Sequence, residues 1–380
     1  MKQDSSQAPG AKARYIMVGG FLGAGKTTAV AKLARWLTDK GQRVGLITND
    51  QGSHLVDTTM LAARGFPVEE IPGGCFCCRF NSLVEAAKRL TEDSRPDVFI
   101  AEPVGSCTDL VATVTYPLRK LYGKEFSIAP LSVLVDPIRA LRVLGLEGGG
   151  KFSEKVIYIY RKQLEEADLI VVNKSDLPTR EQMSGLSGEL GVQFPKGRIF
   201  EVSARHGKGL EGWFEHITST SQVPRAIMEV DYGVYADGEA QLGWLNCTLR
   251  LKATEAIDGN QLVQGLANEV QSRLNQAGAE VAHLKMTLDA DNALGDLAVI
   301  NLVRNDFVPE LSQNLQDRFA SGELTINMRA EAAPEALRDI VKLAVEKCVQ
   351  AYPTLTLDWE HMESFRPGKP QPTHRITVPG

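Results

Sequence analysis

Short apolar runs alternate with longer amphipathic stretches along the first half of the chain. Between Tyr15 and about Thr220, each of the following runs precedes a helical or loop segment: YIMV, VGLITN, VEEI, VFIAE, LSVLV, LIVVN and RIFEVS. Apolar runs of this length, rich in β-branched residues and separated by helical stretches, are typical of βα units. The pattern therefore predicts an α/β domain with a mainly parallel sheet.

The pattern changes after residue 220. Alternate positions are apolar in five later segments, which predict strands: Leu245–Leu251, Ala282–Leu288, Ala298–Leu302, Leu324–Met328 and Leu355–Leu357. Helical spacing of apolar residues occurs in two more segments, Leu262–Leu274 and Leu337–Cys348. The order β-α-β-β-β-α-β favours a smaller α+β sandwich with helices on one face of an antiparallel sheet.

The chain of 380 residues is about the length of two domains. The predicted segments are a flexible N-terminus at 1–13, the α/β domain at 14–220, a linker at 221–240, the α+β domain at 241–363 and a loosely ordered, Pro-rich tail at 364–380.

Composition and charge narrow the class of protein. Hydrophobic residues make up 43% and charged residues 23% of the chain, in the range of globular proteins. The net charge of -5 does not suggest a nucleic acid or an anionic membrane as partner. The polar amino end has no apolar core of a signal peptide, and no segment approaches the roughly 18 apolar residues of a membrane span. We therefore expect a cytoplasmic protein.

A phosphate-binding motif directly follows the first strand. The sequence GFLGAGKT fits GxxxxGK[ST], and Thr28 continues it into a predicted helix. In such a loop, backbone N–H groups surround the phosphates, the lysine reaches the β and γ oxygens, and the threonine hydroxyl binds Mg²⁺. We expect Lys26 and Thr27 to have these roles. The small residues of the same loop are Gly20, Gly23, Ala24 and Gly25.

The nucleotide base is predicted from Asn173, Lys174 and Asp176 of NKSD, which follow the run LIVV. A carboxylate there accepts hydrogen bonds from the ring N–H and the amino group of guanine, whereas adenine would leave it unpaired. Ser203 and Ala204 occupy the place from which GTPases cover the guanine with a backbone N–H. The motif therefore indicates GTP rather than ATP; a capped helix start is the alternative reading of NKSD.

A carboxylate also ends the strand VFIAE. We expect this Glu102 to be the second acidic group on the magnesium side, and Gly105 to approach the γ-phosphate. No glutamine follows Gly105, so the water-orienting residue of Ras-like enzymes is missing, and we expect slow unassisted hydrolysis.

Half of the six cysteines lie in IPGGCFCCRF, as Cys75, Cys77 and Cys78. In a reducing compartment, clustered cysteines are more often metal ligands or redox catalysts than disulfides. Three thiolates with one replaceable ligand suit a transferable zinc or similar ion, whereas four form a closed site. A structural zinc clip and a redox pair are the alternatives. Cys107 is either a fourth thiolate or a small buried residue.

Four motifs follow one another along the chain in the order GFLGAGKTT, PGGCFCC, EPVG and NKSD. With these motifs, the chain resembles the CobW-type metallochaperone GTPases, relatives of UreG and HypB, over about residues 14–220. In that family the cysteine motif binds a transition metal between the switch segments, and the GTP cycle controls its transfer to a client. The resemblance implies metal ligation by Cys75, Cys77 and Cys78, and it matches Asp50 to an acidic switch residue that serves metal or water. The His-rich tract of many CobW-type chains is missing here.

These observations support one main hypothesis and two alternatives. The main hypothesis is a slow GTPase that uses GTP and Mg²⁺ and delivers Zn²⁺, or else Co²⁺ or Ni²⁺, to a client apo-metalloprotein. Lys26 would stabilise phosphate charge, Thr27 and Glu102 would hold Mg²⁺, and Asp50 would orient water or the metal. A GTP-dependent homodimer is left open. The alternatives are a GTP-gated interaction switch with a structural zinc, and a P-loop kinase, against which NKSD argues.

Overall fold

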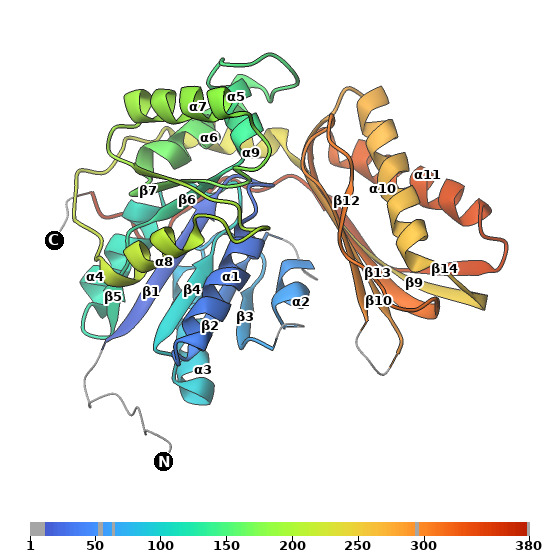
Figure 1. The fold of residues 1–380 in the computed structure, drawn as a ribbon, viewed down its shortest axis with the longest axis horizontal. Coiled ribbons are helices and arrows are strands. Elements are labelled where there is room, and N and C mark those ends of the chain that lie inside the picture. Colours follow the sequence, from blue (N-terminus) through green and yellow to red (C-terminus); the bar gives the residue numbers. More distant parts are fainter. Residues whose placement is uncertain (1–11, 52–55, 63–64, 293–295, 378–380) are drawn as a thin grey trace.

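The computed structural model describes residues 12–51, 56–62, 65–292 and 296–377. These residues form two domains that lie side by side, each built on its own sheet (Figure 1). Most of the segment predicted to be a flexible N-terminus, residues 1–11, lies outside the described residues.

The first domain has the predicted mainly parallel sheet, with strand order β3-β2-β4-β1-β6-β7-β8 and β5 beside β1. The strands are β1 (Ala13–Gly20), β2 (Val44–Asn49), β3 (Val68–Ile71), β4 (Val98–Glu102), β5 (Phe126–Ile128), β6 (Ser132–Val135), β7 (Leu169–Val172) and β8 (Arg198–Glu201). Each apolar run noted in the sequence forms one of them. Strand β5 was not predicted, because three residues are too few to show a period.

Both faces of this sheet are covered. Tyr15 and Met17 of β1 belong to the hydrophobic core on one face, whereas Ile16 and Val18 belong to the core on the other. A strand buried on both faces is apolar throughout, which explains the continuous apolar runs. The covering helices are α1 (Lys26–Asp39), α2 (Val56–Ala62), α3 (Phe80–Ser94), the π-helix η1 (Val111–Thr115), α4 (Tyr116–Tyr122), α5 (Pro137–Val143), α6 (Glu154–Glu166), α7 (Arg180–Gln193) and α8 (Leu210–Ser219).

The second domain has the predicted antiparallel sheet, in the order β12-β11-β10-β13-β9-β14, with helices on the face away from the first domain (Figure 1). Its elements are β9 (Gly243–Ile257), α10 (Gly259–Gln276), β10 (Glu280–Ala290), β11 (Leu297–Leu302), β12 (Glu310–Gln313), β13 (Phe319–Glu331), α11 (Pro334–Gln350) and β14 (Leu355–Phe365). The predicted order lacked β12 and was wrong there, because ELSQ is polar and no member of β12 is buried.

The segment predicted as a linker contains helix α9 (Tyr232–Gln241), whose Tyr235, Gly238 and Glu239 are buried. The Asp231 side chain caps this helix, since it accepts the N–H groups of Gly233 and Val234. The sequence did not predict α9, because glycine in a helix interior is unfavourable and the segment has no continuous apolar stripe at helical spacing.

The Pro-rich tail returns to the first domain instead of lying loosely at the surface. The Thr373 N–H donates to the Cys77 carbonyl at 2.8 Å, and the Ile376 N–H donates to the Ala112 carbonyl at 2.9 Å. The ring of His374 meets the edge of Phe80, with 4.9 Å between centroids. The expectation of a loosely ordered tail was therefore wrong for residues 371–376, because contacts with a distant segment hold them.

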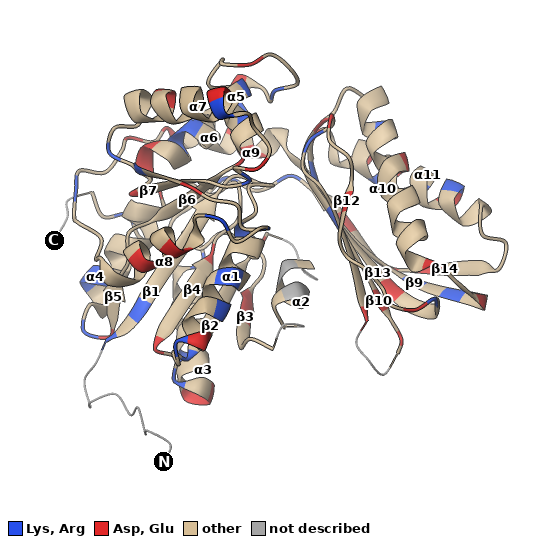
Figure 2. Cartoon of the chain, viewed as in Figure 1, with Lys and Arg blue, Asp and Glu red and all other residues tan. Residues whose placement is uncertain are grey.

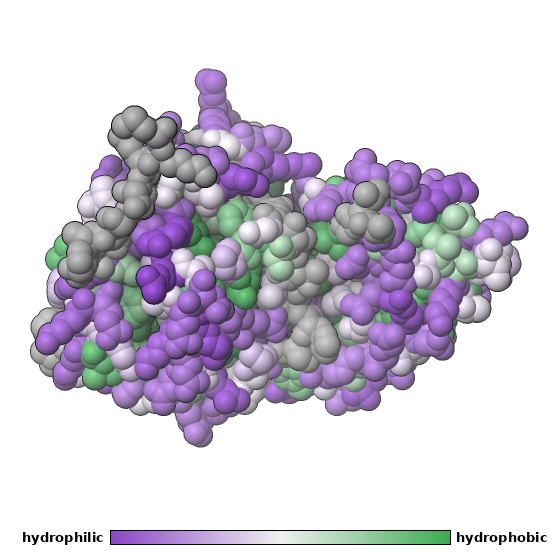
Figure 3. All heavy atoms as spheres, turned by 90° about the horizontal axis from the view of Figure 1, so that it is seen from below, coloured by the Kyte–Doolittle hydropathy of each residue, from purple (hydrophilic) through white to green (hydrophobic). Residues whose placement is uncertain are grey.

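Charged residues of both signs are interspersed over the helices and loops of both domains (Figure 2). The face seen in Figure 3 is mainly hydrophilic, with hydrophobic side chains in small patches. Among the described residues, no helix combines the length and apolar character needed to cross a membrane.

Candidate functional site

The phosphate-binding loop joins β1 to α1. The Lys26 ammonium donates to the Gly20 carbonyl at 2.9 Å, and the Thr27 hydroxyl donates to Oε1 of Glu102 at 3.0 Å. All three side chains named as phosphate or magnesium groups, those of Lys26, Thr27 and Glu102, are buried. Gly25 has a φ of +90°, and a Cβ there would lie 2.5 Å from Nδ2 of Asn173. Only glycine fits this position.

Asn173 joins the phosphate loop to the base side of the site. Its Nδ2 donates to the Ala24 carbonyl, and its Oδ1 accepts the Ala204 N–H, both at 2.9 Å. Lys174 donates to the Gly23 carbonyl at 2.8 Å. Asp176 lies at the exposed end, 3.6 Å from Nε2 of His206.

Most of these residues line one cavity of about 360 Å³. The predicted nucleotide residues that line it are Gly23, Gly25, Lys26, Thr27, Thr28, Asp50, Glu102, Gly105, Asn173, Lys174, Asp176, Ser203 and Ala204. Gly20 and Ala24 lie just behind them and act through their carbonyls, which hold Lys26 and Asn173. The cavity therefore offers a phosphate loop at one end and a carboxylate at the other, which is the arrangement that a nucleotide requires.

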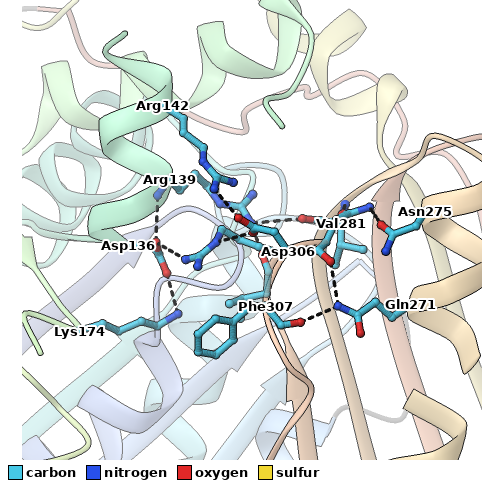
Figure 4. Close-up of polar contacts among 12 residues, drawn as sticks. Asp136, Arg139, Arg142, Lys174, Gln271, Asn275, Val281, Asp306 and Phe307 are labelled. Carbon is cyan, nitrogen blue, oxygen red and sulfur yellow. Dashed lines mark hydrogen bonds and ion pairs between the residues drawn. The ribbon is translucent and has the colours of Figure 1, made fainter. Parts of the chain in front are cut away.

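The sequence did not point to Asp136, which follows β6 and forms ion pairs with two residues that line the cavity. Asp136 accepts the ammonium of Lys174 at 2.8 Å and a guanidinium N–H of Arg304 at 3.4 Å (Figure 4). Burial alone would raise its pKa, but the charges of Lys174 and Arg304 outweigh burial and lower the pKa. Its place at the end of a parallel strand, beside the phosphate loop, was the available signal.

Asp50 is held by the second domain. Its carboxylate accepts two hydrogen bonds from Nη2 of Arg329, at 3.3 and 3.1 Å. Arg329 is fully buried, and its guanidinium lies 4.0 Å from the Trp244 ring centroid. No local pattern could have revealed this partner, because 279 residues separate the two.

The three cysteines between β3 and α3 form the cluster that the sequence predicted as a metal site. Their sulfur atoms lie 2.7 Å (Cys75 to Cys77), 3.2 Å (Cys75 to Cys78) and 3.7 Å (Cys77 to Cys78) apart. All three ligand atoms fall within 4.8 Å of one another, so one ion could contact them all. Nδ2 of Asn49 donates to the carbonyls of Ile71 and Gly74, which holds the loop against β2.

Two further buried groups adjoin the cluster. Hydrogen bonds from Cys107, Cys77 and Cys78 lower the pKa of Cys75, whereas burial raises the pKa of Cys107. Glu239 of α9 accepts the Ser106 hydroxyl at 2.6 Å, and burial raises the pKa of this carboxyl group. The tail covers the outer side, where the Gln371 N–H donates to the sulfur of Cys78 at 3.2 Å.

The cysteine cluster and the nucleotide cavity share two chain segments. The Gly74 N–H lies 3.5 Å from the Asp50 carbonyl, so the cysteine loop contacts the segment after β2. Strand β4 ends at Glu102, beside Thr27, and the segment after it reaches Cys107, beside Cys75. A movement of either segment would therefore affect both sites.

A parallel sheet with a GxxxxGKT loop after its first strand and an NKSD segment after β7 defines the nucleotide-binding domain of a P-loop GTPase class. Residues 14–199 match the family described as "CobW/HypB/UreG, nucleotide-binding domain". The match covers the first domain, just under half of the chain, so this domain is similar to that family.

Curated relatives with detectable similarity include two zinc chaperones. The chain is 31% identical to zinc chaperone YeiR of Escherichia coli (strain K12) over 176 residues, which are 46% of this chain and 50% of YeiR. It is 30% identical to zinc chaperone CobW of Sinorhizobium sp over 229 residues, 54% of this chain and 62% of that protein. The chain thus spans only about half to three fifths of the length of these relatives.

Solved structures that match this chain include HypB from Archaeoglobus fulgidus, with a TM-score of 0.37 and 19% identity, over 54% of this chain and 88% of that chain. Zn(II)-bound YjiA GTPase from E. coli has a TM-score of 0.37 and 14% identity, over 89% of this chain and 99% of that chain.

Proposed function

We propose that this protein is a metal-responsive GTPase that hydrolyses GTP to GDP and phosphate and delivers a transition metal, zinc in the first place, to a client protein. One observation carries the proposal: the three-cysteine cluster contacts the same two segments that border the phosphate end of the cavity. Both curated relatives described above bear the name zinc chaperone, which supports zinc over cobalt and nickel.

In the nucleotide cycle, Lys26 stabilises the charge that develops on the phosphates, and Asp176 selects guanine. Thr27 and Glu102 fit a magnesium site, because a hydroxyl and a buried carboxylate lie 3.0 Å apart beside the phosphate loop and hard oxygen donors suit this ion. A magnesium ion held by Thr27 and Glu102 would supply positive charge beside the phosphates.

Metal affinity and GTP affinity are coupled in this proposal, since both ligands act on the segments that hold Asp50 and Glu102. Coupling of binding free energies is reciprocal. If bound GTP raises the affinity for zinc by some factor, bound zinc raises the affinity for GTP by the same factor, typically about 5–150-fold. Cys75, Cys77 and Cys78 are the ligands, and the client takes the remaining position on the metal.

The test is a competition titration of zinc against a chromophoric chelator, with a GTP analogue, with GDP or without nucleotide. We expect zinc affinity to differ between the three states. Cys77→Ser with Cys78→Ser should lose tight zinc binding and the zinc dependence of GTP affinity while GDP binding persists. Cys348→Ser, a half-buried cysteine in the second domain, is the matched control. Equal zinc affinity in all three states would contradict delivery.

A GTP-gated interaction switch with a structural zinc is the second candidate. Burial favours it, since Cys75 and Cys77 are only 4% and 1% exposed and the tail lies over Cys78. Zinc exchange during GTP turnover separates the two functions: a structural zinc stays bound through the cycle, and a delivered zinc passes to the chelator.

A further inference from the structure

The nucleotide cavity is not formed by the first domain alone. Strands β10 and β11, the 303–309 loop and β12 line the side that faces the phosphate loop and NKSD. Lining residues from this domain include His283, Lys285, Val303, Arg304, Phe307 and Ser312. The predicted site residues, by contrast, all come from the first domain, because local motifs mark only that half.

Close packing fixes the second domain at this position. Gly23 of the phosphate loop has a φ of +78°, and a Cβ there would lie 3.0 Å from the Ala282 carbonyl oxygen and 3.1 Å from Cβ of Val303. The buried guanidinium of Arg139, at the start of α5, donates to the Val281 carbonyl at 3.2 Å. The phosphate loop and the ends of β10 and β11 are therefore in direct contact.

A charged network holds the 303–309 loop beside NKSD (Figure 4). Arg304 lies between Asp136, at 3.4 Å, and Asp306, at 3.1 Å. Asp306 also pairs with Arg142 of α5, while Asp136 binds Lys174. The loop of the second domain and the lysine of NKSD thus share one buried carboxylate.

This network presents an aromatic ring to the cavity. The half-buried Phe307 points from the loop toward Lys174 (Figure 4), and Arg304 lies 5.2 Å from its ring centroid. Its backbone is held on the opposite side, where Nε2 of Gln271 in α10 donates to its carbonyl at 2.5 Å. Both Phe307 and Asp176 line the cavity.

We propose that Phe307 is a base-binding residue, on which the guanine of the nucleotide stacks while Asp176 binds its edge. This inference rests on the proposed GTP binding and adds that the nucleotide contacts both domains. A purine has a large π face, and stacking on an aromatic side chain is favourable whatever the hydrogen-bonding edge. The base is therefore covered by a residue that lies about 130 positions after NKSD in sequence.

The test compares GDP with inorganic pyrophosphate, which lacks the base, by calorimetry on the full chain. Phe307→Ala should lower the affinity for GDP about 10-fold, which is the effect of losing one stacked base, and leave the affinity for pyrophosphate unchanged. Phe307→Trp should keep GDP affinity. Val308→Ala is the matched control, because that neighbouring side chain is 71% exposed.

Each outcome is decisive for one of the two proposals. A wild-type chain that binds no guanine nucleotide contradicts the proposed function. The stacking role is overturned if the wild type binds GDP no more tightly than Phe307→Ala does. It is also overturned if Phe307→Ala weakens the binding of GDP and of pyrophosphate equally. Should Phe307→Ala not fold, the Phe307→Trp fluorescence decides: stacking requires that GDP quench its additional emission and that pyrophosphate leave it unchanged.

Discussion

In the proposed function, the choice of base depends on a single carboxylate. Asp176 is partly exposed at the edge of the cavity, and an acid there offers two acceptor oxygens, whereas an amide offers one acceptor and one donor group. Asp176→Asn should therefore weaken GDP about 10-fold or more and reduce discrimination against xanthine nucleotides. Affinities for GDP, XDP and ADP measure this, with Asp237→Asn, an exposed residue of α9, as control. Equal GDP and ADP affinities in the wild type would contradict the guanine assignment.

Glu166, at the end of α6, is a buried acid that the nucleotide chemistry does not use. It accepts the Thr108 hydroxyl and the Val111 N–H, each at 3.1 Å. Burial, followed by the charge of Asp109, raises its pKa to about 8. Because the folded state then binds the proton more tightly than the unfolded state, the free energy of unfolding should fall as the pH rises from about 4.5 to 8, by at most about 1.4 kcal/mol per pH unit.

Glu166→Gln should remove this part of the pH dependence. Urea denaturation at about pH 5.5 and pH 7.5 measures it, and the variant should lose less stability between the two than the wild type does. Glu165→Gln, the exposed neighbour that pairs with Lys162, should behave as the wild type. A slope shared by all three proteins would show that Glu166 keeps an ordinary pKa.

Among the elements, the C-terminal tail has the most direct effect on the cysteine cluster. Arg375 donates to Asp109 at 2.7 Å, and the residues before it contact Cys77 and Cys78. A segment held by few contacts can open without global unfolding. We therefore expect the tail to limit access to the half-buried Cys78 and to open by local detachment.

Truncation of the chain after Pro370 removes these contacts. The rate of Cys78 alkylation by iodoacetamide, followed by peptide mass spectrometry, should rise severalfold, because the sulfur loses the Gln371 N–H and the Cys78 carbonyl loses the Thr373 hydroxyl. Truncation after Thr377 leaves every described tail contact and should not change the rate. Identical rates in the two truncated proteins would mean that the tail does not protect the cluster.

At the scale of the whole molecule, the two domains are joined through functional residues as well as apolar packing. Arg329 of β13 binds Asp50, Arg304 binds Asp136, and Val56 N–H donates to Asn327 at 3.0 Å. Domain contacts made by site residues make the relative position of the domains sensitive to what the site binds. In the proposed function, the second domain is thus placed to respond to the nucleotide and to the metal.

A double-mutant cycle on Asp50→Asn and Arg329→Met measures one of these links. Because Arg329 is fully buried, each single variant removes an ion pair that water screens little, and the coupling in free energy of unfolding should be about 1–3 kcal/mol. The exposed pair Lys155 and Asp237 is the control, for which coupling of less than about 1 kcal/mol is expected. Additive effects at Asp50 and Arg329 would remove the pair as a domain link.

The sequence by itself determined whatever depends on neighbouring residues. Strand and helix periodicity gave both domains their class, since the period of apolar positions follows from local backbone geometry. The phosphate loop, NKSD and the cysteine cluster are contiguous motifs, so the amino-acid sequence alone identifies their residues. The sequence did not predict strands β5 and β12 or helix α9, because short, polar or weakly amphipathic segments carry little periodic signal.

Only the tertiary structure decided which distant residues complete the sites. Asp50 and Arg329 are 279 positions apart, and Gln371 and Cys78 are 293 apart. The position of Phe307 beside Lys174 likewise depends on how β10 and β11 meet the phosphate loop. Such contacts follow from the packing of whole domains, which no local pattern encodes, because a side chain's sequence neighbours fix its conformation but not the surface against which it lies.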